Sequence, residues 1–366
     1  MTTRNYYSSH VHGPFETFSI GDFALESGGT LRDLKLAYRT LGELSPGKDN
    51  VVLFPSWYSG SSKILEQAYI GPGRVLHPER YFIILVNQIG NGLSSSPHNT
   101  PAPFDAARFP RVTIGDDVRA QHRLITEKFG IRELALVIGG SMGAQQTYDW
   151  AIRFPDIVKR AAPIAGTARV TPHNRLLVET FIEAITSDPA WDGGWYDTAQ
   201  SVQRGLRRHA RVFGASAFTP QVFNQELWRQ LGFSSQEDFI IGFLEGHFVP
   251  QDPNNLLALL AKWKGADATR ITRETLKHAL AGIAASVAVI AIDEDAFFPL
   301  TDIEREQRLI PNSTLKRISS PWGHLALFGI DPNYNRAIDD ILLELLSGEI
   351  SGMRELARPV LAAAKN

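Results

Sequence analysis

The residues best suited to chemistry lie in a glycine-rich pentapeptide. Residues 139–143 read Gly-Gly-Ser-Met-Gly and fit the pattern G-x-S-x-G, which is typical of a nucleophilic serine on a tight turn between a strand and a helix. A serine hydroxyl is a weak nucleophile at neutral pH, so a base must take its proton and a carboxylate must orient that base. Ser141 could instead be an ordinary helix cap, but the apolar run before it and the helical pattern after it favour catalysis.

Chain order restricts the base and the acid. With this kind of turn, the expected order is serine, then Asp or Glu, then histidine. Only His324 follows both Ser141 and the predicted strand after which the acid should lie. The acid belongs on the loop after that strand, where Asp293, Glu294 and Asp295 stand in a row. We favour Asp295, because the Ala-Phe-Phe-Pro that follows it could bury it, and we keep Asp293 as the alternative.

A tetrahedral intermediate also needs two backbone N–H groups to hold its oxyanion. The residue after the nucleophile, Met142, supplies one of them. The other should come from the loop at residues 55–62, which follows an apolar run at residues 51–54. Trp57 is our choice for this second donor and Tyr58 is the next candidate. We also expect Tyr58 to contact the substrate.

Short apolar runs predict the strands that would position these residues. Residues 51–54, 81–86 and 134–138 are apolar on both faces, as strands buried between helix layers are. A helical pattern fills residues 116–129, and strand, helix, strand in this order predicts a parallel sheet. Further strands are expected at residues 160–165, 286–292 and 315–319, an antiparallel pair within residues 18–42, and helices at residues 144–154, 302–309 and 334–346.

The pattern becomes helical after the fourth of these parallel strands. We predict helices at residues 174–186, 198–213, 220–231 and 254–264, in a stretch that holds four of the seven tryptophans. We therefore divide the chain into a core of residues 1–170, a helical cap of residues 171–283 and the rest of the core, residues 284–366. The cap is expected to roof the pocket and to select the acyl or alcohol group.

Composition excludes several classes of protein. The 37 basic and 39 acidic side chains nearly cancel to a net charge of -2, so no global field attracts nucleic acid. The chain has no cysteine, which excludes a thiolate nucleophile and a disulfide framework. No apolar run reaches the length of a membrane span, and we expect a soluble, cytoplasmic protein. The glycine-serine loop at residues 90–97 lacks the phosphate-binding pattern, and we interpret it as pocket wall.

The residues around Ser141 resemble the homoserine O-acetyltransferase family of the α/β-hydrolase superfamily. The resemblance rests on residues 139–146 and 150–156, and on Asp295 shortly before an aromatic pair and a proline. It implies an α/β-hydrolase fold: a mostly parallel central sheet flanked by helices, with an inserted helical cap. It also implies a ping-pong reaction, in which Ser141 takes an acyl group, His324 relays protons, and an alcohol or water accepts the acyl group. Acetyl-CoA could be the donor substrate; no other cofactor and no metal is expected.

Two departures from the family concern the acceptor. Members that use homoserine typically have an aspartate directly after the base histidine, where it contacts the substrate amine; this chain has Leu325 there. The corresponding glycine loop of the family carries a cysteine, whereas residues 90–97 of this chain read Gly-Asn-Gly-Leu-Ser-Ser-Ser-Pro. An ammonium group would be left unpaired beside Leu325, at a cost of several kcal/mol. We therefore expect Leu325 to contact an uncharged substrate, and homoserine not to be the acceptor.

We predict a serine-dependent acyl-transfer enzyme, an ester hydrolase or O-acyltransferase, that acts on small uncharged acyl esters. One alternative is a homoserine or serine O-acetyltransferase that uses acetyl-CoA. Another is a catalytically inactive hydrolase fold that binds a ligand or partner. A dehydrogenase would need a G-x-G-x-x-G motif after an early strand, which the chain lacks. The expected partner is a small ester or alcohol, and a homodimer is the default assembly.

Overall fold

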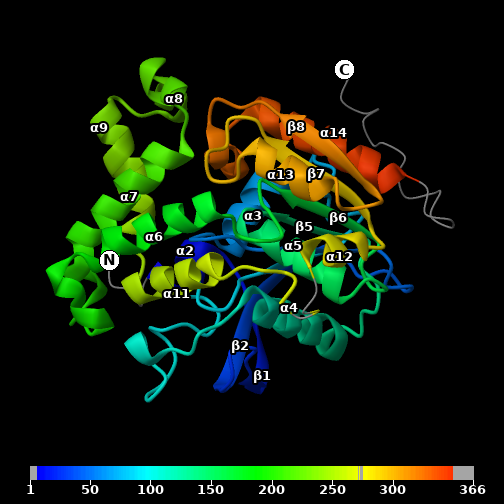
Figure 1. Ribbon diagram of the computed structural model, residues 1–366, viewed down its shortest axis with the longest axis horizontal. Helices are drawn as coiled ribbons and strands as arrows, with labels where there is room; N and C mark the ends of the chain where they lie inside the picture. The colour runs from blue at the N-terminus through cyan, green and yellow to red at the C-terminus, as the bar shows by residue number, and fades with distance from the viewer. Residues whose placement is uncertain (1–5, 271, 273–274, 349–366) are drawn as a thin grey trace.

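A single eight-stranded sheet forms the centre of the computed structural model, which describes residues 6–270, 272 and 275–348 (Figure 1). The spatial order of its strands is β1-β2-β4-β3-β5-β6-β7-β8. The strands are β1 (Glu16–Ala24), β2 (Thr30–Leu41), β3 (Val51–Pro55), β4 (Phe82–Val86), β5 (Leu136–Gly140), β6 (Arg160–Ile164), β7 (Ser286–Ile292) and β8 (Ser313–Ile318).

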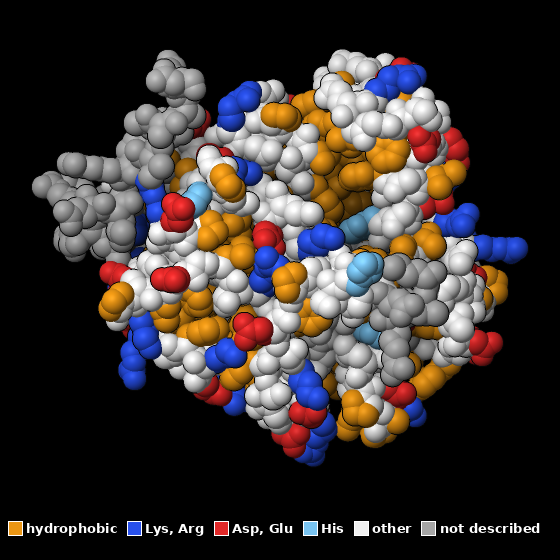
Figure 2. All heavy atoms as spheres, turned by 180° about the vertical axis from the view of Figure 1, so that it is seen from behind, with side chains coloured by type: hydrophobic (Ala, Val, Ile, Leu, Met, Phe, Trp, Pro, Cys, Tyr) orange, Lys and Arg blue, Asp and Glu red, His pale blue; other side chains and the backbone are white. Residues whose placement is uncertain are grey.

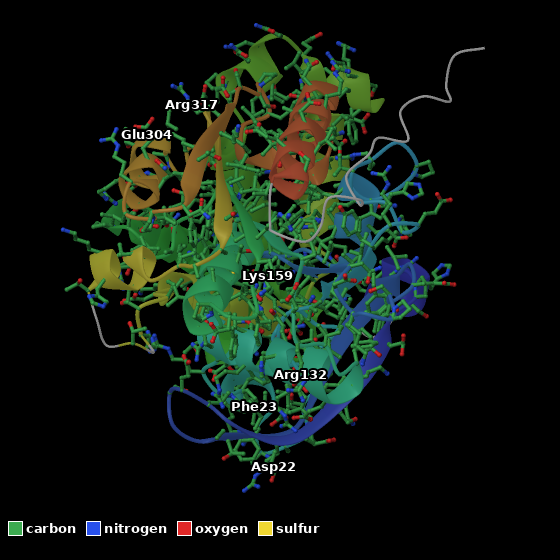
Figure 3. The ribbon with its side chains drawn as sticks, turned by 90° about the vertical axis from the view of Figure 1, so that its right-hand side faces the viewer. Asp22, Phe23, Arg132, Lys159, Glu304 and Arg317 are labelled. Carbon is green, nitrogen blue, oxygen red and sulfur yellow. The ribbon has the colours of Figure 1, made fainter. Side chains whose placement is uncertain are left out.

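The sheet is mostly parallel. Strands β4, β3, β5, β6, β7 and β8 run parallel, while β2 pairs antiparallel with both β1 and β4. The predicted antiparallel pair is therefore correct, and its turn contains Gly28 and Gly29, both with positive φ. Strands β1 and β8 are the two edges, and Figure 3 shows Asp22 and Phe23 of β1 far from Arg317 of β8.

Helices cover the sheet, which explains why its inner strands are apolar on both faces. Every residue of β3, β4, β5 and β6 is buried. Helix α5 packs on β3, β5 and β6, α4 packs on α5, α3 on β4, and α14 on β6, β7 and β8. The helices outside the predicted cap are α2 (Ser9–His12), α3 (Ser62–Tyr69), α4 (Ile114–Arg123), α5 (Met142–Arg153), α13 (Leu300–Gln307) and α14 (Pro332–Ser347), with the 3-10 turns η1 (Ala106–Arg108) and η7 (Gly323–Phe328) and the π-helix η2 (Leu124–Lys128).

The chain between β6 and β7 is helical, and most of it gathers on one side of the sheet, at the left of Figure 1. Helix α6 packs against α7 and α11, and α7 packs against the π-helix η6. The segment comprises α6 (Pro172–Thr186), η3 (Pro189–Gly194), η4 (Ala199–Val202), α7 (Gln203–Ala217), α8 (Pro220–Asn224), η5 (Leu227–Leu231), α9 (Gln236–Phe239), η6 (Ile240–Glu245), α10 (Gly246–Phe248), α11 (Pro253–Lys264) and α12 (Leu276–Ala281).

One predicted helix of this segment is wrong. Residues 220–231 form α8 and the 3-10 turn η5 rather than one helix, because Glu226 between them takes a left-handed conformation with φ 52°. The helices at residues 236–248 were not predicted. The domain boundaries at residues 170 and 283 stay a prediction, and residues 1–5, 271, 273–274 and 349–366 lie outside the described residues. Within the described part of the chain, no helix is long and apolar enough to cross a membrane.

Candidate active site

The residues singled out from the sequence all follow the carboxyl ends of parallel strands. Ser141 follows β5, Asp295 lies after β7, His324 after β8, and Trp57 after β3. Carboxyl ends of parallel strands meet at one edge of a sheet, where open α/β folds bind their ligands. The topology therefore brings these four residues from distant parts of the chain to one place.

Ser141 sits on a strained turn between β5 and α5. Its φ of 54° and ψ of -121° are unusual for a residue with a side chain, and such strain costs about 1–3 kcal/mol and concentrates at functional sites. The turn is also crowded, since a Cβ added to Gly139 would lie 2.2 Å from the carbonyl oxygen of Gly143, and one added to Gly143 would lie 2.8 Å from that of Pro55. There is therefore no room for a side chain at either Gly139 or Gly143.

Ser141, His324 and Asp295 form a continuous line of hydrogen bonds. The Nε2 atom of His324 lies 3.0 Å from Oγ of Ser141, and its Nδ1 atom lies 2.7 Å from Oδ2 of Asp295. All three side chains are buried. The hydroxyl of Ser141 makes no capping hydrogen bond to α5, so the interpretation of Ser141 as an ordinary helix cap is wrong.

The three adjacent acidic residues have different partners. The second oxygen of Asp295, Oδ1, accepts the backbone N–H groups of Phe297 at 2.7 Å and Phe298 at 3.2 Å. These donors fix the rotation of the carboxylate, so its other oxygen faces His324. Asp293 instead forms an exposed ion pair with Arg317, at 2.9 and 3.1 Å. Glu294 accepts hydrogen bonds from Ser319 and Ser320. Only Asp295 of the three is hydrogen-bonded to His324.

The backbone N–H groups expected to hold the oxyanion belong to residues next to the turn of Ser141. Met142 is the first residue of α5, so its N–H has no partner within the helix. Trp57 follows β3, and a Cβ added to Gly140 would lie 3.4 Å from its indole ring. Neither N–H donates to an acceptor among the described residues. The N–H of Tyr58 has none either, so it stays the next candidate for the second donor.

The cavity over Ser141 is narrow and apolar. The space open to the centres of water molecules is about 10 Å³, which is room for about one water. Tyr58, which we expect to contact the substrate, contributes to its wall, together with residues of the predicted cap and of the loops after β7 and β8. The lining residues are Trp57, Tyr58, Ser141, Phe213, Trp263, Phe297, His324, Leu327 and Phe328.

An outer pocket of about 300 Å³ adjoins this cavity and shares Phe213 and Phe328 with it. Leu325 lies in the wall of the outer pocket and not in that of the inner cavity. The other lining residues are almost all apolar: Ile64, Gly242, Phe243, Leu244, Gly246, His247 and Phe248. Figure 2 shows an apolar hollow on this face, beneath the lobe that carries α8 and α9. A ligand reaching Ser141 through this pocket would pass Phe213 and Phe328.

Two histidines that sequence reasoning missed hold the loop after β3. Nε2 of His209 lies 2.9 Å from the hydroxyl of Tyr58, and Nε2 of His247 lies 2.9 Å from Oγ of Ser59. Burial lowers the pKa of His209 to about 3 and that of His247 to about 4. Both rings are therefore neutral at ordinary pH and act as hydrogen-bonding supports. No motif signals these contacts.

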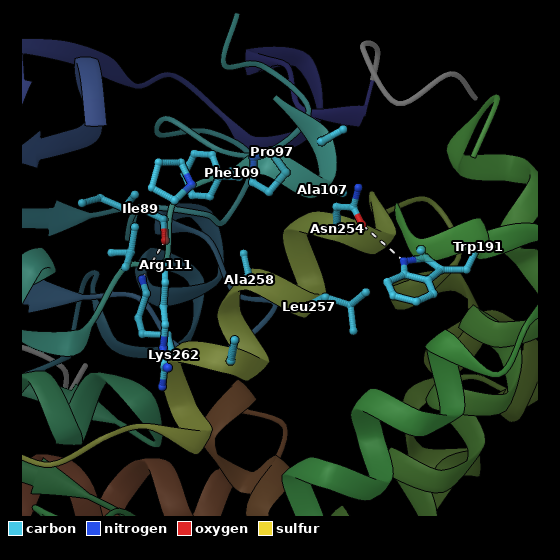
Figure 4. Close-up of a pocket in the computed structure, with 15 residues that line it drawn as sticks. Ile89, Pro97, Ala107, Phe109, Arg111, Trp191, Asn254, Leu257, Ala258 and Lys262 are labelled. Carbon is cyan, nitrogen blue, oxygen red and sulfur yellow. Dashed lines mark hydrogen bonds between the residues drawn. The ribbon is translucent and has the colours of Figure 1, made fainter. Parts of the chain in front are cut away.

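A larger cavity, about 390 Å³, lies away from Ser141, His324 and Asp295 (Figure 4). It is lined by residues such as Arg111, Trp191 and Lys262, and none of Ser141, Asp295 and His324 borders it. The loop at residues 90–97, which we interpret as pocket wall, contributes Pro97 to this cavity and nothing to the one over Ser141. Among the described residues, no group of three or more His, Cys, Asp or Glu side chains is placed to hold a metal ion.

Comparison with known proteins gives the family. Residues 50–329 match the family described as alpha/beta hydrolase fold. The chain is 49% identical to an ethyl acetate hydrolase of Pseudomonas veronii over 343 residues, which cover 94% of this chain and 98% of that protein. A solved acetylester hydrolase from Corynebacterium glutamicum is 47% identical, with a TM-score of 0.93 over 95% of this chain and 100% of that one. A homoserine O-acetyltransferase of Trichormus variabilis is 34% identical over 331 residues, 87% of this chain and 88% of that protein.

The chain belongs to the α/β-hydrolase family, as the fold and the strained serine turn indicated. It is an enzyme of the serine ester hydrolase type. The predicted fold class and reaction class are thereby confirmed, whereas the resemblance to homoserine O-acetyltransferases proves more distant than that to ester hydrolases.

Proposed function

We propose that the enzyme hydrolyses acetate esters of small uncharged alcohols, with Ser141, His324 and Asp295 as its catalytic triad. The observation that carries this proposal is the hydrogen-bonded line of these residues beneath a cavity with room for about one water. The names of the two ester hydrolases that are nearly half identical to this chain support the acetyl group and a small alcohol.

The first half of the reaction forms the acyl-enzyme. Oγ of Ser141 attacks the ester carbonyl while Nε2 of His324 takes its proton, and Asp295 stabilises the imidazolium that results. The N–H groups of Met142 and Trp57 hold the negative charge that develops on the carbonyl oxygen. His324 then gives its proton to the alcohol oxygen, the carbon–oxygen bond breaks, and the alcohol leaves.

The second half releases the acid and restores the enzyme. A water in the alcohol's place loses a proton to His324 and attacks the acetyl carbon. The same two N–H groups hold the oxyanion again, the bond to Oγ of Ser141 breaks, and the proton returns from His324 to Oγ. Water is the only reactant this half-reaction needs besides the acyl-enzyme.

The outer pocket supports an uncharged alcohol. Its wall is almost wholly apolar and includes Leu325, and the described part of the wall contains no carboxylate to pair with an ammonium group. His247 is held neutral by burial, which lowers its pKa to about 4, so it would not repel or attract a charge. We infer that the chain is a divergent relative of the homoserine O-acetyltransferases whose acceptor pocket takes no amino alcohol.

Activity measurements on purified protein test this function. We expect steady hydrolysis of ethyl acetate and 4-nitrophenyl acetate, with kcat/KM falling as the acyl chain lengthens from acetate to octanoate. Ser141→Ala should lose about 10⁶-fold in kcat, because triad members act as a unit. Ser187→Ala, at the end of α6 and outside both pockets, is a matched control that should keep full activity.

The alternative activities predict different results. Release of CoA from acetyl-CoA only when homoserine or serine is present would contradict the proposal and favour an O-acetyltransferase. Folded wild-type protein that neither hydrolyses esters nor reacts with a fluorophosphonate at Ser141 would favour a binding protein without activity.

A further inference from the structure

The loop after β3 is held through one buried carbonyl oxygen. The oxygen of Ser56 accepts two side-chain amides, Nε2 of Gln88 and Nε2 of Gln146, each at 3.1 Å. All three residues are fully buried. The peptide bond that contains this C=O also contains the N–H of Trp57, and in a planar trans peptide the two point in opposite directions. Holding the carbonyl therefore fixes the direction of the Trp57 N–H.

The orientation of Gln88 is set from its other end by Lys262. Nζ of Lys262 lies 3.1 Å from Oε1 of Gln88 and 2.6 Å from the carbonyl oxygen of Ile89, a contact visible in Figure 4, and it also contacts Asp117. One proton can lie on either Lys262 or Asp117, which contact each other. In both cases Nζ of Lys262 keeps at least two N–H groups and can donate to Gln88. Gln88 must then turn its oxygen to Lys262 and its amide nitrogen to Ser56.

The orientation of Gln146 is set in the same way by a tryptophan. Nε1 of Trp150, which can only donate, lies 2.7 Å from Oε1 of Gln121. Nε2 of Gln121 is therefore free to donate to Oε1 of Gln146, at 2.6 Å. This leaves the amide nitrogen of Gln146 for the carbonyl of Ser56. Both series of hydrogen bonds therefore begin at a group that can only donate, Lys262 or Trp150, and end at the carbonyl oxygen of Ser56. Neither glutamine amide can rotate by 180° without losing a hydrogen bond.

We propose that Gln88 and Gln146 are positioning residues for oxyanion binding: together they hold the Ser56–Trp57 peptide so that the loop presents its N–H to the developing charge. This proposal rests on the proposed function, in which that N–H stabilises the tetrahedral intermediate. Two bonds from different directions fix the plane of a peptide better than one. They also polarise it, which makes its N–H a stronger donor.

A purely structural role and a positioning role differ in what they change. Loss of packing alone would lower the melting temperature without a specific effect on the oxyanion. Loss of position would weaken binding of the charged transition state while substrate binding stays the same. A trifluoromethyl ketone, whose adduct with Ser141 places an oxyanion between the same N–H groups, reports the second effect directly.

The test uses glutamine-to-methionine substitutions, which keep length and remove the amide. Gln88→Met and Gln146→Met should each lower kcat about tenfold, the effect of losing one hydrogen bond, with KM within about twofold. The double variant should approach the ~10²-fold loss typical of a missing oxyanion donor. The inhibition constant of a trifluoromethyl ketone should rise by the same factor as kcat falls in each variant.

Gln145→Met is the matched control. Gln145 adjoins Gln146 in α5 and is equally buried, and its two side-chain polar atoms have no hydrogen-bond partner among the described residues. The control should keep kcat and the inhibition constant of the ketone. If a Gln variant fails to fold, Trp150→Phe removes the N–H donor to Gln121 together with part of a buried ring, and it should lower kcat about threefold, a fraction of one hydrogen bond, and raise the inhibition constant of the ketone by the same factor.

The outcomes separate the two proposals. Folded variants that keep wild-type kcat and ketone affinity would overturn the positioning role while leaving ester hydrolysis intact. A drop in melting temperature with unchanged ketone affinity would also overturn it. Wild-type protein without esterase activity would instead contradict the proposed function itself.

Discussion

Replacing Asp295 with asparagine should disable the triad while leaving its shape unchanged. Oδ1 of Asp295 accepts two backbone N–H groups, from Phe297 and Phe298, so only an oxygen is stable in that position. The new NH2 group must then take the place of Oδ2 and donate to Nδ1 of His324, 2.7 Å away. The proton of the ring moves to Nε2, which then faces Ser141 as a donor and cannot act as a base. Holding the histidine in the wrong tautomer in this way lowers kcat about 10⁴-fold, which corresponds to a rise of about 5 kcal/mol in the activation free energy.

The measurement is kcat/KM on 4-nitrophenyl acetate, with ¹⁵N NMR of the histidine rings to locate the proton on His324. Asp293→Asn is the control, because it breaks only an exposed pair with Arg317, worth at most about 1 kcal/mol of stability, and activity should stay within about twofold. The assignment of the acid would be refuted if Asp295→Asn kept more than a tenth of the wild-type activity. It would also be refuted if Asp293→Asn lost more activity than Asp295→Asn.

Two further predictions concern the turn and the core. Gly139→Ala should destabilise the protein by at least about 3 kcal/mol, read as a lower urea midpoint, because the added Cβ would lie 2.2 Å from the backbone oxygen of Gly143; an unchanged midpoint would show that the turn relaxes freely. Burial raises the pKa of Glu306 from 4.5 to about 7. The unfolded chain therefore loses this proton before the folded protein does, so stability is greatest below pH 4.5 and falls as pH rises from 4.5 to about 7. Glu306→Gln should remove about 2.5 kcal/mol of this fall in stability between pH 5 and pH 8, and equal slopes of stability against pH for both proteins would contradict the prediction.

The hydrogen-bonded line of Ser141, His324 and Asp295 was predictable because each residue carries a local signal. Ser141 has glycines where backbone atoms come too close for a side chain. His324 was identified by chain order, and Asp295 by the aromatic pair behind it, whose N–H groups do fix the carboxylate. The parallel strands were found because burial on both faces makes them uniformly apolar; β5 nevertheless begins at Leu136, two residues later than expected.

The supports of the site were not predictable from the sequence. Glutamine residues occur in most sequence patterns and so give no signal of their own. Gln88 and Gln146 both reach the carbonyl of Ser56, and Lys262 reaches Gln88, only because β4, α5 and α11 pack around one loop. The π-helix η6, which borders the outer pocket, depends on tertiary packing and has no local sequence signal. Leu325 was expected to contact substrate, but its place in the outer pocket depends on the turn η7, which sequence reasoning did not foresee.

The choice between water and an alcohol as acyl acceptor follows from the space at Ser141. The inner cavity has room for about one water, so the ester, and any acceptor larger than water, must displace Phe213 and Phe328, which line both pockets. An amino alcohol would in addition bring an ammonium group against Leu325 and lose its hydration without gaining a partner, at a cost of several kcal/mol. Water meets neither barrier. We therefore propose that the same serine chemistry, which the names of the more distant relatives associate with acyl transfer, leads to hydrolysis here, because the outer pocket is apolar and the inner cavity is narrow once the alcohol has left.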